Sequence, residues 1–237
     1  MFTSIDLSMS YHQIEIEESS RKYTGFSTTS GSYIWRAAPF GLASSGPALM
    51  NAVSQTLALE PALFPFVIPY VDDILLHNGE GGNERHFELL ELLFQVLRKA
   101  NLKIPPAKSK FMQREIKYIG HQISGDGITA DSDRISALLS TPTPQNRKQL
   151  KSLLGAYSYL RRGIQGFAIT ARPLKDFLKV GVPFKWKEEH ETANNKIKVA
   201  LAEYPTLHFP DDGPTGLEFV ISTDASASAV GYTLSQR

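Results

Sequence analysis

The chain has 237 residues, a hydrophobic fraction of 42%, a charged fraction of 21% and a formal net charge of +1, which exclude a largely disordered chain and leave room for one large or two modest domains. The near-neutral charge does not by itself indicate a nucleic-acid-binding protein, and the absence of cysteine excludes disulfides and thiolate metal sites. No apolar stretch reaches the roughly 20 residues that span a bilayer, and the first residues lack a signal-peptide pattern, so we expect an intracellular, cytoplasmic protein that is neither secreted nor membrane-bound.

The first third of the chain is expected to combine strands with one helix. Apolar and polar residues alternate around residues 2–7 and again over 14–16, which is the period of half-buried strands. Residues 43–57 have apolar residues at helical spacing and few β-branched ones, which predicts a buried helix. The apolar, β-branched run over 66–76 contains two adjacent aspartates, and its length predicts two strands that turn at these acids.

A helix and further short strands are predicted in the middle of the chain. Apolar residues at three- and four-residue steps over 84–100 are typical of an amphipathic helix packed on a sheet, with an end near Asn101. Short strands are predicted over 117–119 and 121–123, and the turn-forming residues 124–127 follow them.

From residue 131 onward the sequence becomes mainly helical. Asn146, with Gln149 three residues later, resembles a capping box, and the apolar stripe that follows predicts a helix. The rest of the chain is predicted to contain two more helices, over 171–179 and 188–203, and two strands, over 217–222 and 229–234.

Two adjacent carboxylates inside an apolar strand run are costly unless they bind something, because buried charges need partners. Nucleotidyl transfer uses two divalent cations about 4 Å apart with carboxylates as bridging ligands, and Mg²⁺ prefers such oxygens. Consecutive strand residues point to opposite faces, so Asp72 and Asp73 would need Asp6 from another strand to complete a site. The alternative is a plain hairpin turn at Asp72 and Asp73, with Asp6 as a charge that protects a strand edge.

Tyr70-Val71-Asp72-Asp73 resembles the Tyr-X-Asp-Asp hairpin of reverse transcriptases. Upstream, residues 5–14 resemble the strand that carries the family's other catalytic aspartate, and residues 39–47 resemble its Pro-Phe-Gly-Leu turn and the start of the template-grip helix. Downstream, residues 118–121 resemble the primer grip, and residues 150–155 resemble the first thumb helix. These motifs stand in the order in which the family has them.

Further short segments are similar to the Gypsy type of long-terminal-repeat retrotransposons: residues 159–162, 173–174, 184–186 and 223–226. The resemblance covers nearly the whole chain. It implies an α+β fold with a reverse-transcriptase-like palm, in which helices back an antiparallel sheet. By this resemblance, residues 1–126 are a palm with residual fingers strands, 127–204 a helical thumb and connection, and 205–237 the truncated start of a ribonuclease H-like domain.

The function that the resemblance implies is RNA-directed DNA polymerase activity, a nucleotidyl transfer to a primer 3′-hydroxyl. Two Mg²⁺ ions, or Mn²⁺ in their place, would be held by Asp6 and Asp72 as principal ligands and by Asp73 as a weaker one. The implied partners are an RNA or DNA template with its primer, deoxynucleoside triphosphates and the rest of a Pol polyprotein.

The resemblance also implies contacts with the nucleotide and the primer. Tyr11 matches the family's steric gate against a 2′-hydroxyl, Phe40 and Gly41 match residues that contact the nucleotide or the template, and Tyr118, Ile119 and Gly120 match the primer grip. Each set has a structural alternative: a half-buried tyrosine at a strand end, an ordinary turn and a buried edge strand, respectively.

Basic residues on or beside the expected thumb helix could follow the phosphates of a duplex: Lys148, Lys151, Arg161 and Arg162. The alternative is a charged helix face that is simply solvated.

The resembling enzymes carry a fingers segment before the first catalytic strand, and most of their ribonuclease H site lies beyond the position of Arg237. We therefore expect this chain to lack most of the fingers and to be unable to complete ribonuclease chemistry with Asp224 alone. Two other functions stay open on this ground. One is a catalytically inactive nucleic-acid-binding remnant, and the other is a structural subunit of a larger assembly.

Overall fold

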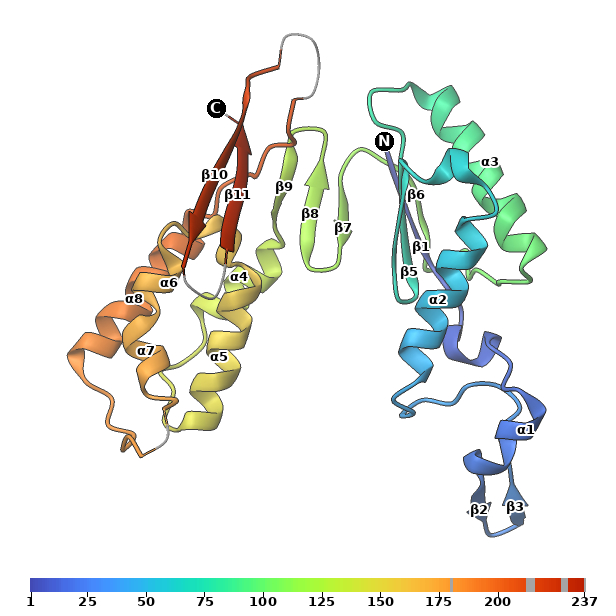
Figure 1. Ribbon diagram of the computed structural model, residues 1–237, viewed down its shortest axis with the longest axis horizontal. Coiled ribbons are helices and arrows are strands. Elements are labelled where there is room, and N and C mark those ends of the chain that lie inside the picture. Colours follow the sequence, from blue (N-terminus) through green and yellow to red (C-terminus); the bar gives the residue numbers. More distant parts are fainter. Residues whose placement is uncertain (180, 212–215, 227–229, 237) are drawn as a thin grey trace. The chain divides into compact units, whose positions relative to one another are not determined.

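A computed structural model of the chain describes residues 1–179, 181–211, 216–226 and 230–236 (Figure 1). The chain forms two compact units, Met1–Ile119 and Gly120–Arg237, each of which has its own hydrophobic core. No helix within the described ranges is long and apolar enough to cross a bilayer.

The first unit is built on a four-stranded antiparallel sheet in the order β4-β5-β1-β6. Its strands are β1 (Phe2–Asp6), β4 (Val67–Tyr70), β5 (Asp73–His77) and β6 (Lys110–Gln113). The centre of β5, over residues 74–76, is buried on both faces, which explains why this stretch of sequence is apolar without alternation. The prediction of two strands that turn at the adjacent aspartates is confirmed.

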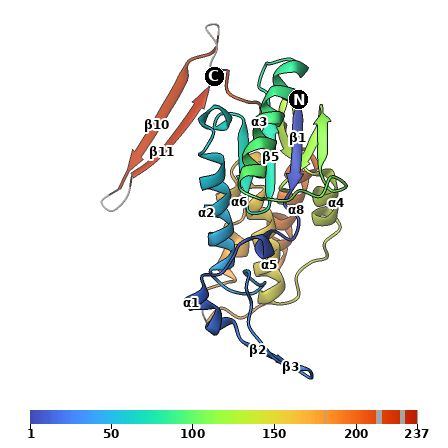
Figure 2. The same cartoon turned by 90° about the vertical axis from the view of Figure 1, so that its right-hand side faces the viewer.

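Two amphipathic helices, α2 (Ser45–Leu57) and α3 (Asn83–Lys99), pack on one side of this sheet (Figures 1 and 2). The helix α3 ends in a Schellman motif, in which Asn101 adopts a φ of 56° and the Leu102 N–H donates to the Leu97 carbonyl at 2.9 Å. Asparagine tolerates this left-handed conformation, so Asn101 ends the helix where the sequence predicted.

The remaining segments of the first unit are short. They comprise η1 (Ser10–Gln13), α1 (Glu18–Arg21), η2 (Lys22–Thr24), η3 (Pro61–Leu63), β7 (Ile116–Tyr118) and an exposed hairpin of β2 (Phe26–Thr28) and β3 (Gly31–Tyr33). The strand predicted over 14–16 was wrong, because this segment makes only an isolated bridge between Glu15 and Ala37. Its alternation reflects half-burial beside η1 rather than membership of a sheet.

The second unit is mainly helical, with a core that includes the buried residues Leu150, Leu154, Tyr157, Ile197 and Leu201. Its helices are α4 (Ser132–Leu139), α5 (Arg147–Tyr159), η4 (Arg161–Gly163), α6 (Phe167–Thr170), α7 (Arg172–Asp176) and α8 (Glu188–Ala202). Within the core, the Tyr157 hydroxyl donates to Asn194 at 2.9 Å, and burial raises the pKa of this tyrosine to about 12.

The helix predicted over 171–179 is present as the shorter α7, and the short helix α6, which the sequence did not predict, precedes it with Ala171 between the two. Pro173 stands in the first turn of α7, where its missing N–H costs nothing, but it could not stand inside one continuous helix. The proline is therefore compatible with the start of α7, one residue after the predicted start at residue 171.

Two hairpins complete the second unit: β8 (His121–Ser124) with β9 (Gly127–Ala130), and β10 (Phe219–Ala225) with β11 (Val230–Gln236). The last two strands run about two residues later than the sequence predicted, and Ala229, the first residue of one predicted strand, lies outside the described residues. The mixture of helices and antiparallel sheets confirms the predicted α+β class. The predicted domain boundaries stay a prediction.

Candidate active site

Two of the three predicted catalytic aspartates face each other across neighbouring strands. Asp6 is the last residue of β1 and Asp73 the first residue of β5, and the two are direct partners in the antiparallel register. Opposite residues in such a pair project from the same face of the sheet. Asp72 lies next to them in the turn, where its carbonyl accepts a hydrogen bond from the Leu7 N–H at 2.9 Å. The fold thus brings all three residues to one end of the sheet.

The turn between β4 and β5 contains an unusual backbone conformation. Val71 and Asp72 form its two-residue loop, because Tyr70 and Asp73 are the closing pair of the strands. Val71 has a φ of 56°, a left-handed conformation that β-branched residues rarely adopt. Tight hairpins of this length need a positive φ at the first loop position, and Val71 packs against the core of the first unit, which offsets the strain.

The three carboxylates repel one another. Burial, followed by the charges of Asp72 and Asp6, raises the pKa of Asp73 above its ordinary value. One cation lies close to the group, since Lys108 Nζ is 3.8 Å from Asp6 Oδ1. Among the ion pairs formed by the described residues, none reaches Asp72 or Asp73.

This donor set fits a divalent cation by its chemistry and its charge. Carboxylate oxygens are the ligands that Mg²⁺ prefers, and a cation would relieve the repulsion that raises the Asp73 pKa. The side chains are not already gathered into a coordination sphere. Within the described ranges, no three acidic, histidine or cysteine residues lie close enough to hold a metal ion.

Tyr118, predicted as part of the primer grip, contacts the hairpin of β4 and β5 that carries Asp72 and Asp73. Its hydroxyl donates to the carbonyls of Ile68 at 2.9 Å and Asp73 at 3.2 Å, so one side chain contacts both strands of the hairpin. Burial raises the Tyr118 pKa, so the hydroxyl stays a donor at neutral pH. After it, Ile119 and Gly120 both have positive φ angles, 46° and 67°, which gives the predicted grip a sharply turned backbone.

The two aromatic residues predicted to contact the nucleotide lie together. The rings of Tyr11 and Phe40 meet edge to face with centroids 5.3 Å apart, and Phe40 is 69% exposed. The next residue, Gly41, has a φ of 92°, which favours glycine there. Sequence reasoning missed two further members of this group. These are His12 and Trp35. The His12 ring stacks on the Trp35 ring with centroids 5.3 Å apart and meets the Phe40 ring edge to face with centroids 5.2 Å apart.

The four basic residues predicted to contact phosphates are all exposed in the second unit. Lys148 and Lys151 are three residues apart on α5, so they lie on the same face of that helix. Arg161 and Arg162 follow on η4.

Comparison with known proteins decides the family. The family described as "Reverse transcriptase (RNA-dependent DNA polymerase)" matches residues 1–123, and that described as "RNase H-like domain found in reverse transcriptase" matches residues 186–237. The chain belongs to the reverse transcriptase family. The aspartates, Tyr11, Phe40 and Tyr118 all lie within the first match.

Relatives of this reverse transcriptase chain are retrotransposon polyproteins. The chain is 34% identical over 236 residues to the retrovirus-related Pol polyprotein from transposon 297 of Drosophila melanogaster, covering 99% of this chain and 22% of the relative. It is 33% identical to the transposon Tf2-3 polyprotein of Schizosaccharomyces pombe, covering 100% of this chain and 17% of that relative. The predicted relationship to long-terminal-repeat retrotransposons is confirmed, and the chain spans about a fifth of the length of these relatives.

Solved structures with the same fold include the foamy viral protease-reverse transcriptase. Its complex with an RNA/DNA hybrid has a TM-score of 0.79 and 25% identity, covering 95% of this chain and 30% of that chain. Its complex with double-stranded DNA has a TM-score of 0.81 and 24% identity, covering 99% of this chain and 48% of that chain. These matches agree with the predicted reverse-transcriptase-like fold.

One side chain near the aspartates of this reverse transcriptase was missed by sequence reasoning. Gln13 donates from Nε2 to the carbonyls of Ser8 and Lys103, the latter at 3.1 Å, and its Oε1 accepts from the Lys103 N–H at 2.7 Å. Because Ser8 lies two residues after Asp6, this amide connects the aspartate strand to a segment some 90 residues away. The sequence contains no signal that would reveal such a long-range contact.

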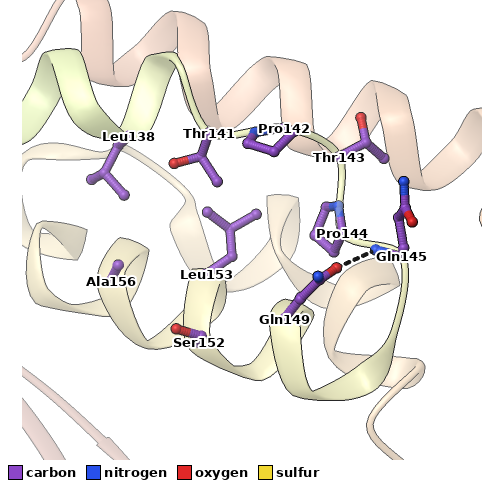
Figure 3. A pocket seen from close by; sticks show the side chains of 10 residues that line it. All are labelled: Leu138, Thr141, Pro142, Thr143, Pro144, Gln145, Gln149, Ser152, Leu153 and Ala156. Atoms are coloured by element: carbon purple, nitrogen blue, oxygen red, sulfur yellow. Dashed lines mark hydrogen bonds between the residues drawn. The ribbon is translucent and has the colours of Figure 1, made fainter.

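A pocket in the second unit lies between the end of α4, the proline-containing loop over 141–145 and α5 (Figure 3). The Gln149 side chain spans part of it and accepts a hydrogen bond from the Gln145 N–H at 2.7 Å. Its lining mixes apolar residues such as Leu153 with hydroxyl groups such as that of Thr141. None of the predicted site residues lines this pocket.

Proposed function

We propose that this chain carries the polymerase site of an RNA-directed DNA polymerase, which adds deoxynucleotides to a primer 3′-hydroxyl. The observation that carries the proposal is the strand register, which sets Asp6 opposite Asp73 and next to Asp72 in the hairpin turn. Family membership over residues 1–123 supports the same activity.

In the proposed reaction the primer 3′-hydroxyl gives up its proton to solvent as its oxygen attacks the α-phosphorus of a deoxynucleoside triphosphate. A new P–O bond forms, and the bond from the α-phosphorus to the oxygen bridging it to the β-phosphorus breaks with release of pyrophosphate. Asp6, Asp72 and Asp73 would hold two Mg²⁺ ions, or Mn²⁺ in their place. When bound, these ions supply positive charge that offsets the charge developing on the phosphate. The fold contributes rigidity, because Tyr118 fixes both strands of the hairpin that carries two of the ligands.

The nucleotide would bind beside Tyr11 and Phe40. The edge-to-face contact between these rings restricts where the Tyr11 side chain can move, which supports a role as a steric gate against the 2′-hydroxyl of a ribonucleotide. The positive φ of Gly41 lets the backbone turn directly after the exposed Phe40 ring.

The proposed nucleic-acid partner is an RNA or DNA template annealed to a primer. The foamy viral structures that share this fold hold double-stranded DNA or an RNA/DNA hybrid, which supports this class of partner. The sharply turned backbone at Tyr118, Ile119 and Gly120 would position the primer, with the Tyr118 side chain serving as a support rather than a contact. The exposed basic residues of the second unit would follow duplex phosphates: Lys148, Lys151, Arg161 and Arg162.

The larger context also belongs to the proposal. We place a palm over 1–126, a thumb and connection over 127–204 and the start of a ribonuclease H-like domain over 205–237, all within a Pol polyprotein that acts in the cytoplasm. The relatives are polyproteins, and the ribonuclease H-like match over residues 186–237 supports the last part of this division.

A primer-extension assay tests the function. A labelled DNA primer on an RNA template is incubated with the chain, deoxynucleotides and Mg²⁺, and the products are separated by length. We expect extension that a chelator abolishes. A nucleic-acid-binding remnant is the second candidate, favoured by the absence of a gathered carboxylate group among the described residues. Binding that weakens steeply with salt, without any extension at saturating Mg²⁺ and nucleotide, would select it instead.

A further inference from the structure

Gln13 ties the loop over 103–109 to the segment that follows the aspartate strand. Its amide makes three hydrogen bonds, to the Ser8 carbonyl and to both backbone groups of Lys103. The Ser8 N–H adds a fourth link when it donates to the Lys103 carbonyl at 3.1 Å. The Gln13 side chain is half-buried and hydrogen-bonded at both polar atoms, so these bonds hold it in one position rather than leaving it solvated.

The same loop presents Lys108 from a stiff turn. The N–H groups of Lys108 and Ser109 donate to the carbonyls of Pro105 and Pro106 at 3.1 and 3.2 Å, and both prolines limit the backbone. Lys108 Nζ lies 3.8 Å from Asp6 Oδ1, and the side chains are 69% and 28% exposed, respectively. An ion pair this exposed is weak, so another cation can displace it.

We propose that Lys108 is a built-in counter-ion of Asp6 that a divalent cation must displace, and that Gln13 is the positioning residue that holds the 103–109 loop in place for this contact. The proposal rests on the proposed metal-binding function of Asp6. Before the cation binds, the ammonium group offsets part of the negative charge of the three carboxylates. When the cation binds, the Lys108 side chain moves into solvent. The free energy of the lost ion pair between Lys108 and Asp6 is subtracted from that of cation binding, so the apparent affinity for the cation is lower.

Mn²⁺ binding tests this without any polymerase assay. The chain, free of nucleic acid and nucleotide, is titrated with Mn²⁺, and the paramagnetic resonance signal of the free ion reports the dissociation constant. Lys108→Met removes the counter-ion and is expected to tighten binding about two- to fivefold, the strength of an exposed ion pair. Lys110→Met is the matched control, because it removes an equal charge from an exposed lysine of β6 that makes no described ion pair, and it should leave the constant unchanged.

A double-mutant cycle isolates the role of Gln13. Gln13→Met keeps the length of the side chain and removes its hydrogen bonds, so alone it should tighten Mn²⁺ binding in the same direction as Lys108→Met. Combined with Lys108→Met it should add nothing, because the loop then has no ammonium group at position 108 to hold beside Asp6. If Gln13 had a purely structural role, Gln13→Met would instead change the Mn²⁺ dissociation constant by the same factor in the wild-type chain and in Lys108→Met. Circular dichroism checks that the variants are folded, and the Lys108→Met comparison does not depend on Gln13.

The outcomes separate this inference from the proposed function. If Asp6→Asn weakens Mn²⁺ binding but Lys108→Met and Lys110→Met both match the wild-type chain, the counter-ion role is overturned and the metal-binding function stands. If Asp6→Asn binds Mn²⁺ as the wild-type chain does, the metal assignment fails and the counter-ion role fails with it. Tighter binding by Lys108→Met alone supports both.

Discussion

Asp73 is half-buried beside two other carboxylates, so its ionised form is destabilised in the folded chain. Its folded pKa is raised above the ordinary value of 3.8, so the wild-type chain gains stability as the pH falls through the raised pKa and loses it again as the pH rises. Asp73→Asn removes this cost. In the absence of divalent cations we expect the variant to raise the free energy of unfolding at about pH 7 by at most about 1 kcal/mol, and the gain to shrink towards about pH 4.

Urea unfolding at the two pH values measures this difference. Asp126→Asn serves as the control, because Asp126 is exposed and its side chain makes no described hydrogen bond or ion pair. A loss of stability on Asp73→Asn near neutral pH would mean that the carboxylates do not repel one another as described.

At the scale of single residues, the sequence predicted which aspartates would meet but not how. The need for a partner on a second strand correctly paired Asp6 with the hairpin. The register, which sets Asp6 opposite Asp73 and leaves Asp72 in the turn, depends on the positive φ of Val71. Nothing in a valine signals that conformation, since asparagine and glycine are the residues that usually adopt it. Lys108 and Gln13 act through contacts distant in sequence, which residue patterns do not reveal.

Among the helices, α5 offers a direct test of a predicted cap. Asn146 Oδ1 accepts from the Gln149 N–H at 3.0 Å, as the sequence indicated, whereas Gln149 Oε1 accepts from Gln145 rather than from the cap residue itself. The capping box is therefore only half formed. Asn146→Ala should destabilise the first turn of α5 by about 1 kcal/mol, which corresponds to roughly fivefold faster hydrogen exchange of its amides. Ser152→Ala, at an exposed position of the same helix, should not accelerate exchange.

Elements with long apolar stripes could be predicted from sequence almost to the residue. The helices α2, α3 and α8 begin and end within two residues of their predicted bounds, because each buries a continuous face. Failures came where the pattern was short. The helix α7 ends three residues before its predicted end, the short helix α6 was not predicted, and residues 14–16 alternate without joining a sheet.

The whole molecule has two separate hydrophobic cores, which predicts that damage to one leaves the other intact. Leu93 in α3 and Leu150 in α5 are both fully buried, one in each core. Replacing either leucine with alanine should lower the free energy of unfolding of its own unit by about 2–5 kcal/mol. Hydrogen exchange followed by mass spectrometry should then show faster exchange only within Met1–Ile119 for Leu93→Ala and only within Gly120–Arg237 for Leu150→Ala. Equal acceleration in both units would show that they unfold as one.

The proposed function depends above all on Asp6 and Asp72, which would form the site of nucleotidyl transfer. The most direct measurement is the rate of primer extension on an RNA template at saturating Mg²⁺ for the wild-type chain, Asp6→Asn, Asp72→Asn and the control Asp126→Asn. We predict that each of the first two substitutions lowers the rate at least about a hundredfold, because each removes a charged ligand from the reacting centre, and that the control is unchanged. Extension by Asp6→Asn or Asp72→Asn at the wild-type rate would contradict the claim.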